Sequence, residues 1–159
     1  MNMSKALFGA FLTLSLSLGA SASSFAESAH EHGSSAALQE LMLNNGQKWE
    51  TDDALREGMA AIREALEKNL PHVHHGDMTP AAFAALATGI EQNVDIIIAN
   101  CKLPEAADEQ LHLILTHLLE GGREMEEEGK QTDGVVSAAK ALNSYGEYFE
   151  HQGWRPLPL

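Results

Sequence analysis

Residues 94–119 read V-D-I-I-I-A-N-C-K-L-P-E-A-A-D-E-Q-L-H-L-I-L-T-H-L-L and decide the fold. They contain the end of one strongly apolar helix, the only cysteine, a proline break, and the start of a second apolar helix with two histidines. Pro104 ends the first helix, because its ring removes a backbone N–H and clashes with the preceding turn. The rest of the chain must supply surfaces against which these two helices bury their apolar faces.

Outward from this stretch, apolar residues recur at spacings of three and four, the period of an α-helix that buries one face. Start signals precede each segment, such as Thr51-Asp52-Asp53 and Thr79-Pro80. The predicted long helices cover residues 51–70, 79–103, 104–128 and 132–152, and a shorter one covers residues 34–48. No alternating strand pattern is present. Short connections favour antiparallel neighbours, so we expect an all-α, up-down-up-down antiparallel four-helix bundle with a short extra N-terminal helix.

The first residues have the features of a secretory signal peptide. Lys5 precedes an apolar run over residues 6–18, and small residues before Ala22 or Ala26 suit a cleavage site. We therefore divide the chain into a signal peptide (1–26), a disordered polar tail (27–33), a helical-bundle domain (34–153) and a Pro-rich C-terminal tail (154–159). This division predicts a periplasmic protein with no membrane insertion after cleavage.

The formal net charge of the 159-residue chain is −13. So acidic a surface repels nucleic-acid phosphates and anionic lipids, and it favours cations or a basic periplasmic protein as partner. Cys101 has no second cysteine for an internal disulfide. Its thiol is therefore a buried small hydrophobe, a metal ligand or a group shared with a partner.

Antiparallel helices bring candidate ligands from distant parts of the sequence to one end of the bundle. Met59 and His112 fall about two helical turns from this end, roughly 10–12 Å at 1.5 Å per residue, while Cys101 and His151 fall nearer the rim. Thioether, thiol and imidazole are the groups that copper prefers. Structural roles compete with this hypothesis: Met59 occupies a core position, and His112 lies at the edge of the apolar face. His151 suits a helix C-terminus through the helix dipole, and His117 is expected to face solvent.

A second histidine group, His72-x-His74-His75, is predicted in a loop at the opposite end of the bundle. A His-x-His pair in a flexible loop can chelate copper, nickel or zinc, although histidine-rich loops also occur without a metal.

Catalytic motifs are incomplete. The chain has no nucleotide-binding glycine motif and no C-x-x-C-H for covalent haem. A nucleophilic Cys101 with His112 as base is the one enzymatic arrangement to consider. A thiol at a helix C-terminus faces the negative end of the dipole, which raises its pKa. We therefore expect a protein that is not an enzyme.

Two resemblances add to these inferences. Residues 148–155, Y-F-E-H-Q-G-W-R, resemble the last helix of the periplasmic four-helix cytochromes (soluble b-type and c-prime), which implies non-covalent haem bound by His151 and by Met59, or by Met42 if the short helix counts as first. Residues 43–59, 100–112 and 154–157 resemble a group of small proteobacterial periplasmic helical proteins, which implies the fold but no particular activity.

Two functions follow as hypotheses. The first is a non-enzymatic periplasmic carrier or sensor that binds a transition metal, with copper favoured, or non-covalent haem. In this hypothesis Met59 and His151 bind the cofactor, while Cys101, His112, His72, His74 and His75 are metal ligands. The second is an acidic accessory protein that docks a basic partner and needs no cofactor.

Overall fold

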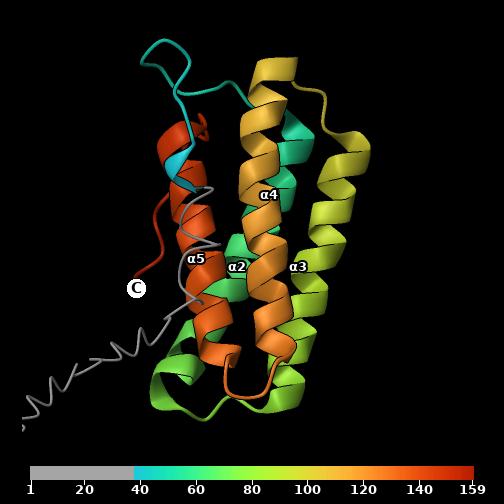
Figure 1. Ribbon diagram of the computed structural model, residues 1–159, viewed down its shortest axis with the longest axis vertical. Coiled ribbons are helices and arrows are strands. Elements are labelled where there is room, and N and C mark those ends of the chain that lie inside the picture. Colours follow the sequence, from blue (N-terminus) through green and yellow to red (C-terminus); the bar gives the residue numbers. More distant parts are fainter. Residues whose placement is uncertain (1–37) are drawn as a thin grey trace, which may run out of the picture.

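The computed structural model describes residues 38–159, so the signal peptide (1–26), the polar tail (27–33) and residues 34–37 lie outside it. Four long helices run alternately up and down (Figure 1). They are α2 (Asp53–His75), α3 (Pro80–Asn100), α4 (Glu105–Glu126) and α5 (Gln131–Tyr148). Consecutive helices pack against each other, and α5 returns to contact α2. The predicted all-α four-helix bundle is confirmed.

Local signals explain where these helices begin. The side chain of Asp52 accepts a hydrogen bond from the Leu55 amide at 2.8 Å and caps α2. Thr79 caps α3 in the same way, and Pro80 occupies the first turn, where its missing N–H is not needed. No side chain caps α4 or α5.

α2 ends later than the sequence predicts. The helix runs through Pro71, which is exposed, and stops at Gly76, whose φ of 68° lies in the left-handed region. The amides of Gly76 and Asp77 donate to the carbonyls of Val73 and His72 and close the last turn. The prediction that His72, His74 and His75 lie in a loop is therefore wrong, because they belong to the last turn of α2.

The core lies between the four helices and is built mostly of aliphatic side chains, with the aromatic rings of Tyr145 and Phe149 also fully buried. Met59, Ile90 and Leu118 are fully buried, as the periodicity predicts. α3 is the one helix of residues 38–159 that is long and apolar enough to cross a membrane by length and composition, a test that core helices also pass, and a third of its most apolar window is buried in the bundle.

α4 and α5 approach each other most closely through glycine. A Cβ atom at Gly121 would lie 2.7 Å from the carbonyl oxygen of Gly134 and 2.9 Å from the amide nitrogen of Ala138. A Cβ atom at Gly134 would lie 2.5 Å from the carbonyl oxygen of Gly121. Both are far inside van der Waals contact, so the bundle requires the absence of a side chain at this crossing.

Residues 40–52 contain no helix, so the prediction that the first helix reaches Lys48 is wrong. Asn45 and Gly46 have φ values of 50° and 84°, and the amides and carbonyls of Asn44 and Gln47 bond to each other around them. Asn-Gly is the sequence signal for such a tight turn.

The end of α5 is also displaced. The helix stops at Tyr148, and Trp49 forms a backbone bridge with Phe149. The Trp49 amide donates to the Tyr148 carbonyl and the Glu150 amide donates to the Trp49 carbonyl, both at 2.8 Å. His151 therefore lies beyond the helix, which the sequence predicts to continue to residue 152.

The C-terminal tail packs against the bundle and belongs to it. Leu157 is 3% exposed, and its backbone N–H and C=O bond to the side chain of Asn143 at 2.7 and 3.0 Å. The indole of Trp154 lies against Gly146, and Arg63 of α2 donates to the Arg155 carbonyl. The tail thus ties α2 to α5.

Candidate functional site

The end of the bundle where α2 and α4 begin is organised around Asp52. One carboxylate oxygen accepts the Leu55 amide, and the other accepts the Lys102 amide at 2.6 Å. Partial burial acts to raise the pKa of Asp52, but the hydrogen bonds from Leu55 and Lys102 outweigh it and leave the pKa below its usual range. Asp52 therefore joins the start of α2 to the end of α3.

Cys101 follows α3, and its amide donates to the Ile97 carbonyl. Burial and the neighbouring charge of Asp52 raise the pKa of the Cys101 thiol to about 11. At neutral pH the group is a thiol, and its thiolate forms only when something replaces the proton.

Cys101 and His112 line one surface pocket of about 270 Å³ between the end of α3 and the first turns of α4. Lys102 and Asp108 also line it, with an apolar floor that includes Ile97 and Leu111. Two of the predicted metal ligands therefore line the same pocket, although Cys101 follows α3 and His112 belongs to α4.

The orientation of His112 is set by its own helix. Its Nδ1 bonds the Asp108 carbonyl at 2.9 Å, and a carbonyl can only accept, so Nδ1 carries the proton. In the neutral ring the lone pair then lies on Nε2. The His112 side chain is 61% exposed, so it can reach an incoming ligand. This arrangement, Nδ1–H to a carbonyl and Nε2 free, is typical of histidines that bind metals.

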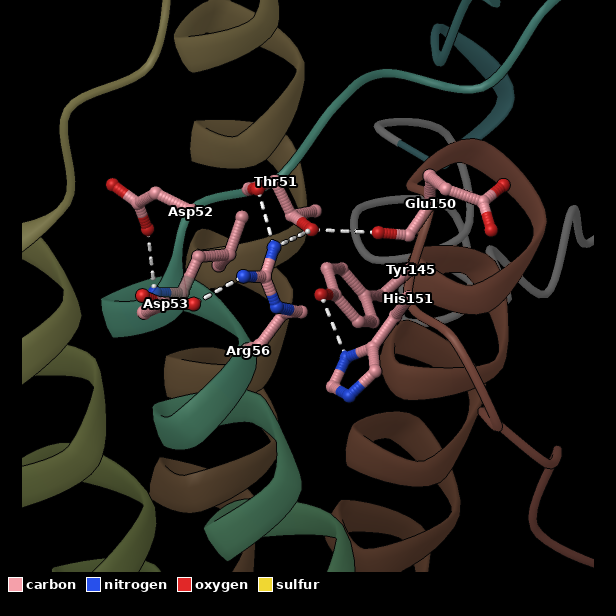
Figure 2. Close-up of polar contacts among 8 residues, drawn as sticks. Thr51, Asp52, Asp53, Arg56, Tyr145, Glu150 and His151 are labelled. Carbon is pink, nitrogen blue, oxygen red and sulfur yellow. Dashed lines mark hydrogen bonds and ion pairs between the residues drawn. The ribbon is translucent and has the colours of Figure 1, made fainter.

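Arg56 holds Thr51 at the start of α2, and Thr51 in turn bonds the segment that follows α5 (Figure 2). Its guanidinium donates to the hydroxyl of Thr51 at 2.9 Å and also contacts the Thr51 carbonyl and Asp53. The Thr51 hydroxyl in turn donates to the Glu150 carbonyl at 2.6 Å. These bonds hold the chain ends in place, and sequence reasoning missed Arg56.

His151 lies close to this group but bonds in another direction. Its Nδ1 is 3.0 Å from the buried hydroxyl of Tyr145, and Figure 2 shows the two side chains facing each other. Burial, and then the charge of Arg56, lower the pKa of His151. Trp154 packs beside both rings. Because Nδ1 is occupied, only Nε2 is open to a ligand.

Met59 does not join the other candidates. It is 0% exposed in the core, and neither Met59 nor His151 lines any of the five principal pockets of the described residues. The bundle topology brings Cys101 and His112 together, whereas Met59 packs as a core residue.

The histidines at the other end are exposed on α2. His72 bonds Asp77 through Nδ1 at 3.0 Å. Residues two apart on a helix point to nearly opposite sides. His72 and His74 therefore do not form the His-x-His metal-binding pair that a flexible loop would allow. His75 shares a face with His72, at a spacing of three.

His117 is the residue that sequence reasoning placed wrongly. It is 2% exposed and lies between α4 and α5, where a solvated side chain was expected. α4 packs against both α3 and α5, so its buried arc is wider than the main apolar stripe. Gln110 and Gly121, seven before and four after His117, are also buried. This second buried stripe of α4 was the sequence signal from which the burial of His117 could have been predicted.

Within residues 38–159, no group of three or more His, Cys, Asp or Glu side chains is placed to hold a metal ion. Any metal at Cys101 and His112 would therefore have two protein ligands. Comparisons with protein-family models, curated proteins and solved structures find no match to this chain. The resemblance to four-helix cytochromes stays a prediction.

Proposed function

We propose that this protein is a non-enzymatic copper carrier or sensor that binds Cu(I) between Cys101 and His112. The observation that carries the proposal is the shared pocket: a thiol and an imidazole from two helices line the same 270 Å³ space. The signal peptide predicted from the sequence would place this activity in the periplasm.

The chemistry of the two groups supports copper over other metals. Thiolate is a soft ligand that favours Cu(I), and imidazole also binds copper. Zinc and iron sites usually need three or four protein ligands, and such a group is absent from the described residues. The fixed Nδ1–H of His112 leaves Nε2 as the ligand atom.

Electrostatics point the same way. Burial is the main reason that the pKa of the Cys101 thiol is raised, and the charges of Asp52 and then Asp108 raise it further. The same negative charges attract a cation, which can take the place of the thiol proton. The haem alternative has less support, because Met59 is fully buried and lines none of the principal pockets.

Copper binding is tested by thermal unfolding with one equivalent of Cu(I) under reducing, oxygen-free conditions. A ligand present at 100 times its Kd stabilises the native state by about 2.7 kcal/mol, so we expect a clear rise in Tm. Cys101→Ser and His112→Gln should each abolish it. His74→Gln is the matched control, since His74 is exposed at the opposite end.

An unchanged Tm with Cu(I), or an equal loss of the shift in the control, would refute the proposal. Haem added to the same protein provides the second arm, read as a Soret band that requires His151.

The second candidate is an acidic accessory protein that needs no cofactor. The net charge of −13 favours it, because a basic partner would be attracted over the whole surface. A complex from periplasmic extract that dissociates with added salt, and that forms equally well with Cys101→Ser and His112→Gln, would favour this function over copper binding.

A further inference from the structure

The last turn of α2 carries three exposed histidines, and two of them share a face of the helix. His72 and His75 are three residues apart, a spacing that makes side chains neighbours on a helix, about 5–6 Å apart at their Cβ atoms. His74 lies on a different face, nearly opposite His72. Because α2 continues through Pro71, the helix creates a histidine pair that a loop would not define.

Asp77 fixes the tautomer of His72. The Oδ1 atom of its carboxylate lies 3.0 Å from His72 Nδ1. A carboxylate only accepts hydrogen bonds, so Nδ1 carries the proton, and the lone pair of the neutral ring is on Nε2. Histidines that bind metals typically donate their other ring N–H to a carboxylate in this way. The structure thus already holds His72 in the form that a metal ligand needs.

The backbone at the end of α2 places Asp77 beside His72. Gly76 has a φ of 68°, which turns the chain back toward the helix. The amide of Asp77 then donates to the His72 carbonyl at 3.1 Å. This bond belongs to the backbone, so it does not depend on the carboxylate that contacts the His72 ring.

An ion can reach both histidines from solvent. The side chains of His72 and Asp77 are 60% and 59% exposed, and His75 is exposed as well. Two nitrogens bound to one ion at about 2.1 Å each, in adjacent positions, lie about 3 Å apart. Exposed side chains change rotamer readily, so His75 can bring its Nε2 to this distance from that of His72.

The number and type of ligands select the kind of metal. Within residues 38–159 no three ligating side chains converge, so this pair offers two protein ligands and leaves the other positions to water. Ni(II) and Cu(II) accept such mixed nitrogen and oxygen ligands, whereas zinc sites usually have three or four protein ligands. Exposed Glu126 and Glu128 lie at the same end of the bundle (Figure 1) and attract cations.

We propose that Nε2 of His72 and Nε2 of His75 bind one divalent ion of the Ni(II) and Cu(II) class, with Asp77 as the positioning residue for His72. This site lies at the opposite end of the bundle from Cys101 and contains no thiol. Imidazole without thiolate favours the divalent ion, whereas a thiolate favours Cu(I). The two ends of the bundle would therefore take different oxidation states of copper.

The test uses Ni(II) as the probe, because Ni(II) does not oxidise the Cys101 thiol as Cu(II) can. Titration calorimetry of the full folded chain at pH 7.5 measures the affinity. Amide NMR locates the ion, since paramagnetic Ni(II) broadens the signals of nearby groups. We expect the first Ni(II) bound to broaden the signals of residues 72–77. An excess of Mg(II), which prefers oxygen ligands, should not displace it.

His72→Gln and His75→Gln should each lower the affinity for Ni(II) about tenfold or more, because each removes one of the two protein ligands. His74→Gln is the matched control, since it changes the same turn on a different face, and it should leave the affinity unchanged. Cys101→Ser should also leave the affinity unchanged. The result for this site is therefore independent of Cu(I) binding.

Asp77→Ala removes the acceptor of His72 Nδ1 and should weaken Ni(II) binding about tenfold, the low end of such effects because the pair is exposed. Asp77→Asn, whose amide oxygen still accepts, should recover part of the affinity. The Tm of the metal-free protein should be the same in both variants, because the backbone bond from residue 77 to the His72 carbonyl remains.

Four outcomes would overturn the proposal. An equal loss of affinity in His74→Gln and His75→Gln would mean that the histidines bind the ion one by one. Displacement of Ni(II) by Mg(II) would indicate general attraction of cations to an acidic surface. Broadening centred outside residues 72–77 would place the ion elsewhere. An unchanged affinity in Asp77→Ala would remove the positioning role of Asp77.

Discussion

The close approach of α4 and α5 gives the sharpest prediction for the fold. Gly121→Ala adds one methyl group whose carbon would lie 2.7 Å from the Gly134 carbonyl oxygen and 2.9 Å from the Ala138 amide nitrogen. Both atoms belong to the backbone of a regular helix, so neither can rotate away. The two helices must separate by several tenths of an ångström along a seam that is otherwise tightly packed.

Two opposing effects set the size of the change. Alanine is a better helix former than glycine by about 1 kcal/mol in a helix interior. Overpacking a well-packed interface costs about 1–3 kcal/mol, and the upper end applies here because the clash is with backbone. We therefore expect a net loss of about 2 kcal/mol. With an unfolding entropy of about 2.1 cal/mol/K per residue, the 122 residues from 38 to 159 should unfold about 8 °C lower.

Gly89→Ala is the matched control. Gly89 lies inside α3, and nothing is within 4 Å of the Cβ atom it would gain. Only the helix propensity changes, so this variant should be about 1 kcal/mol more stable, or about 4 °C higher in Tm. Thermal and urea unfolding measure both variants. If Gly121→Ala is as stable as Gly89→Ala, the helices do not meet as closely as the structure has them.

Three further predictions concern individual groups. Burial lowers the pKa of His117 in the folded protein below the value of about 6.5 in the unfolded chain. As the pH drops below 6.5, the unfolded state takes up the proton first, so the stability of the folded state falls until the pH reaches the lower folded pKa. Urea unfolding between pH 8 and 5 should show this loss, and a His117→Phe variant that folds should show less of it. With a thiol pKa of about 11, Cys101 should be less than about 0.1% thiolate at pH 7.5 and should react slowly with iodoacetamide. Asp52→Asn should lower the pKa of the thiol and speed the reaction. Rapid alkylation of the unaltered protein would instead support an enzymatic role for this cysteine. Asn143→Ala removes both hydrogen bonds to the Leu157 backbone, so we expect the free energy of unfolding to fall by about 1–3 kcal/mol. Hydrogen exchange of the backbone amides over residues 154–159 should become faster. Unchanged exchange there would mean that the buried Leu157 side chain alone holds the tail.

Part of the candidate site followed from the sequence. Short connections between four periodic segments required antiparallel neighbours, and this ordering placed Cys101 and His112 at the same end of the bundle. In the structure both residues line the same pocket. Met59 sits in the core, the structural alternative that its position in the periodic pattern also allowed. The positions of His72 and His74 on a helix could not be predicted, because they depend on α2 continuing through Pro71, and a proline normally ends a helix.

The amino-acid sequence by itself determined the helices and their order, because capping residues, glycine stops and apolar spacing act over a few neighbouring positions. The tertiary structure alone decided the burial of His117, the end of α5 at Tyr148 and the network around Asp52. These depend on contacts between residues far apart in the chain: Asp52 bonds the amide of Lys102, 50 residues away, and Thr51 bonds Glu150, 99 residues away. A local pattern cannot encode such contacts, since they form only when packing of the apolar faces has brought the helix ends together.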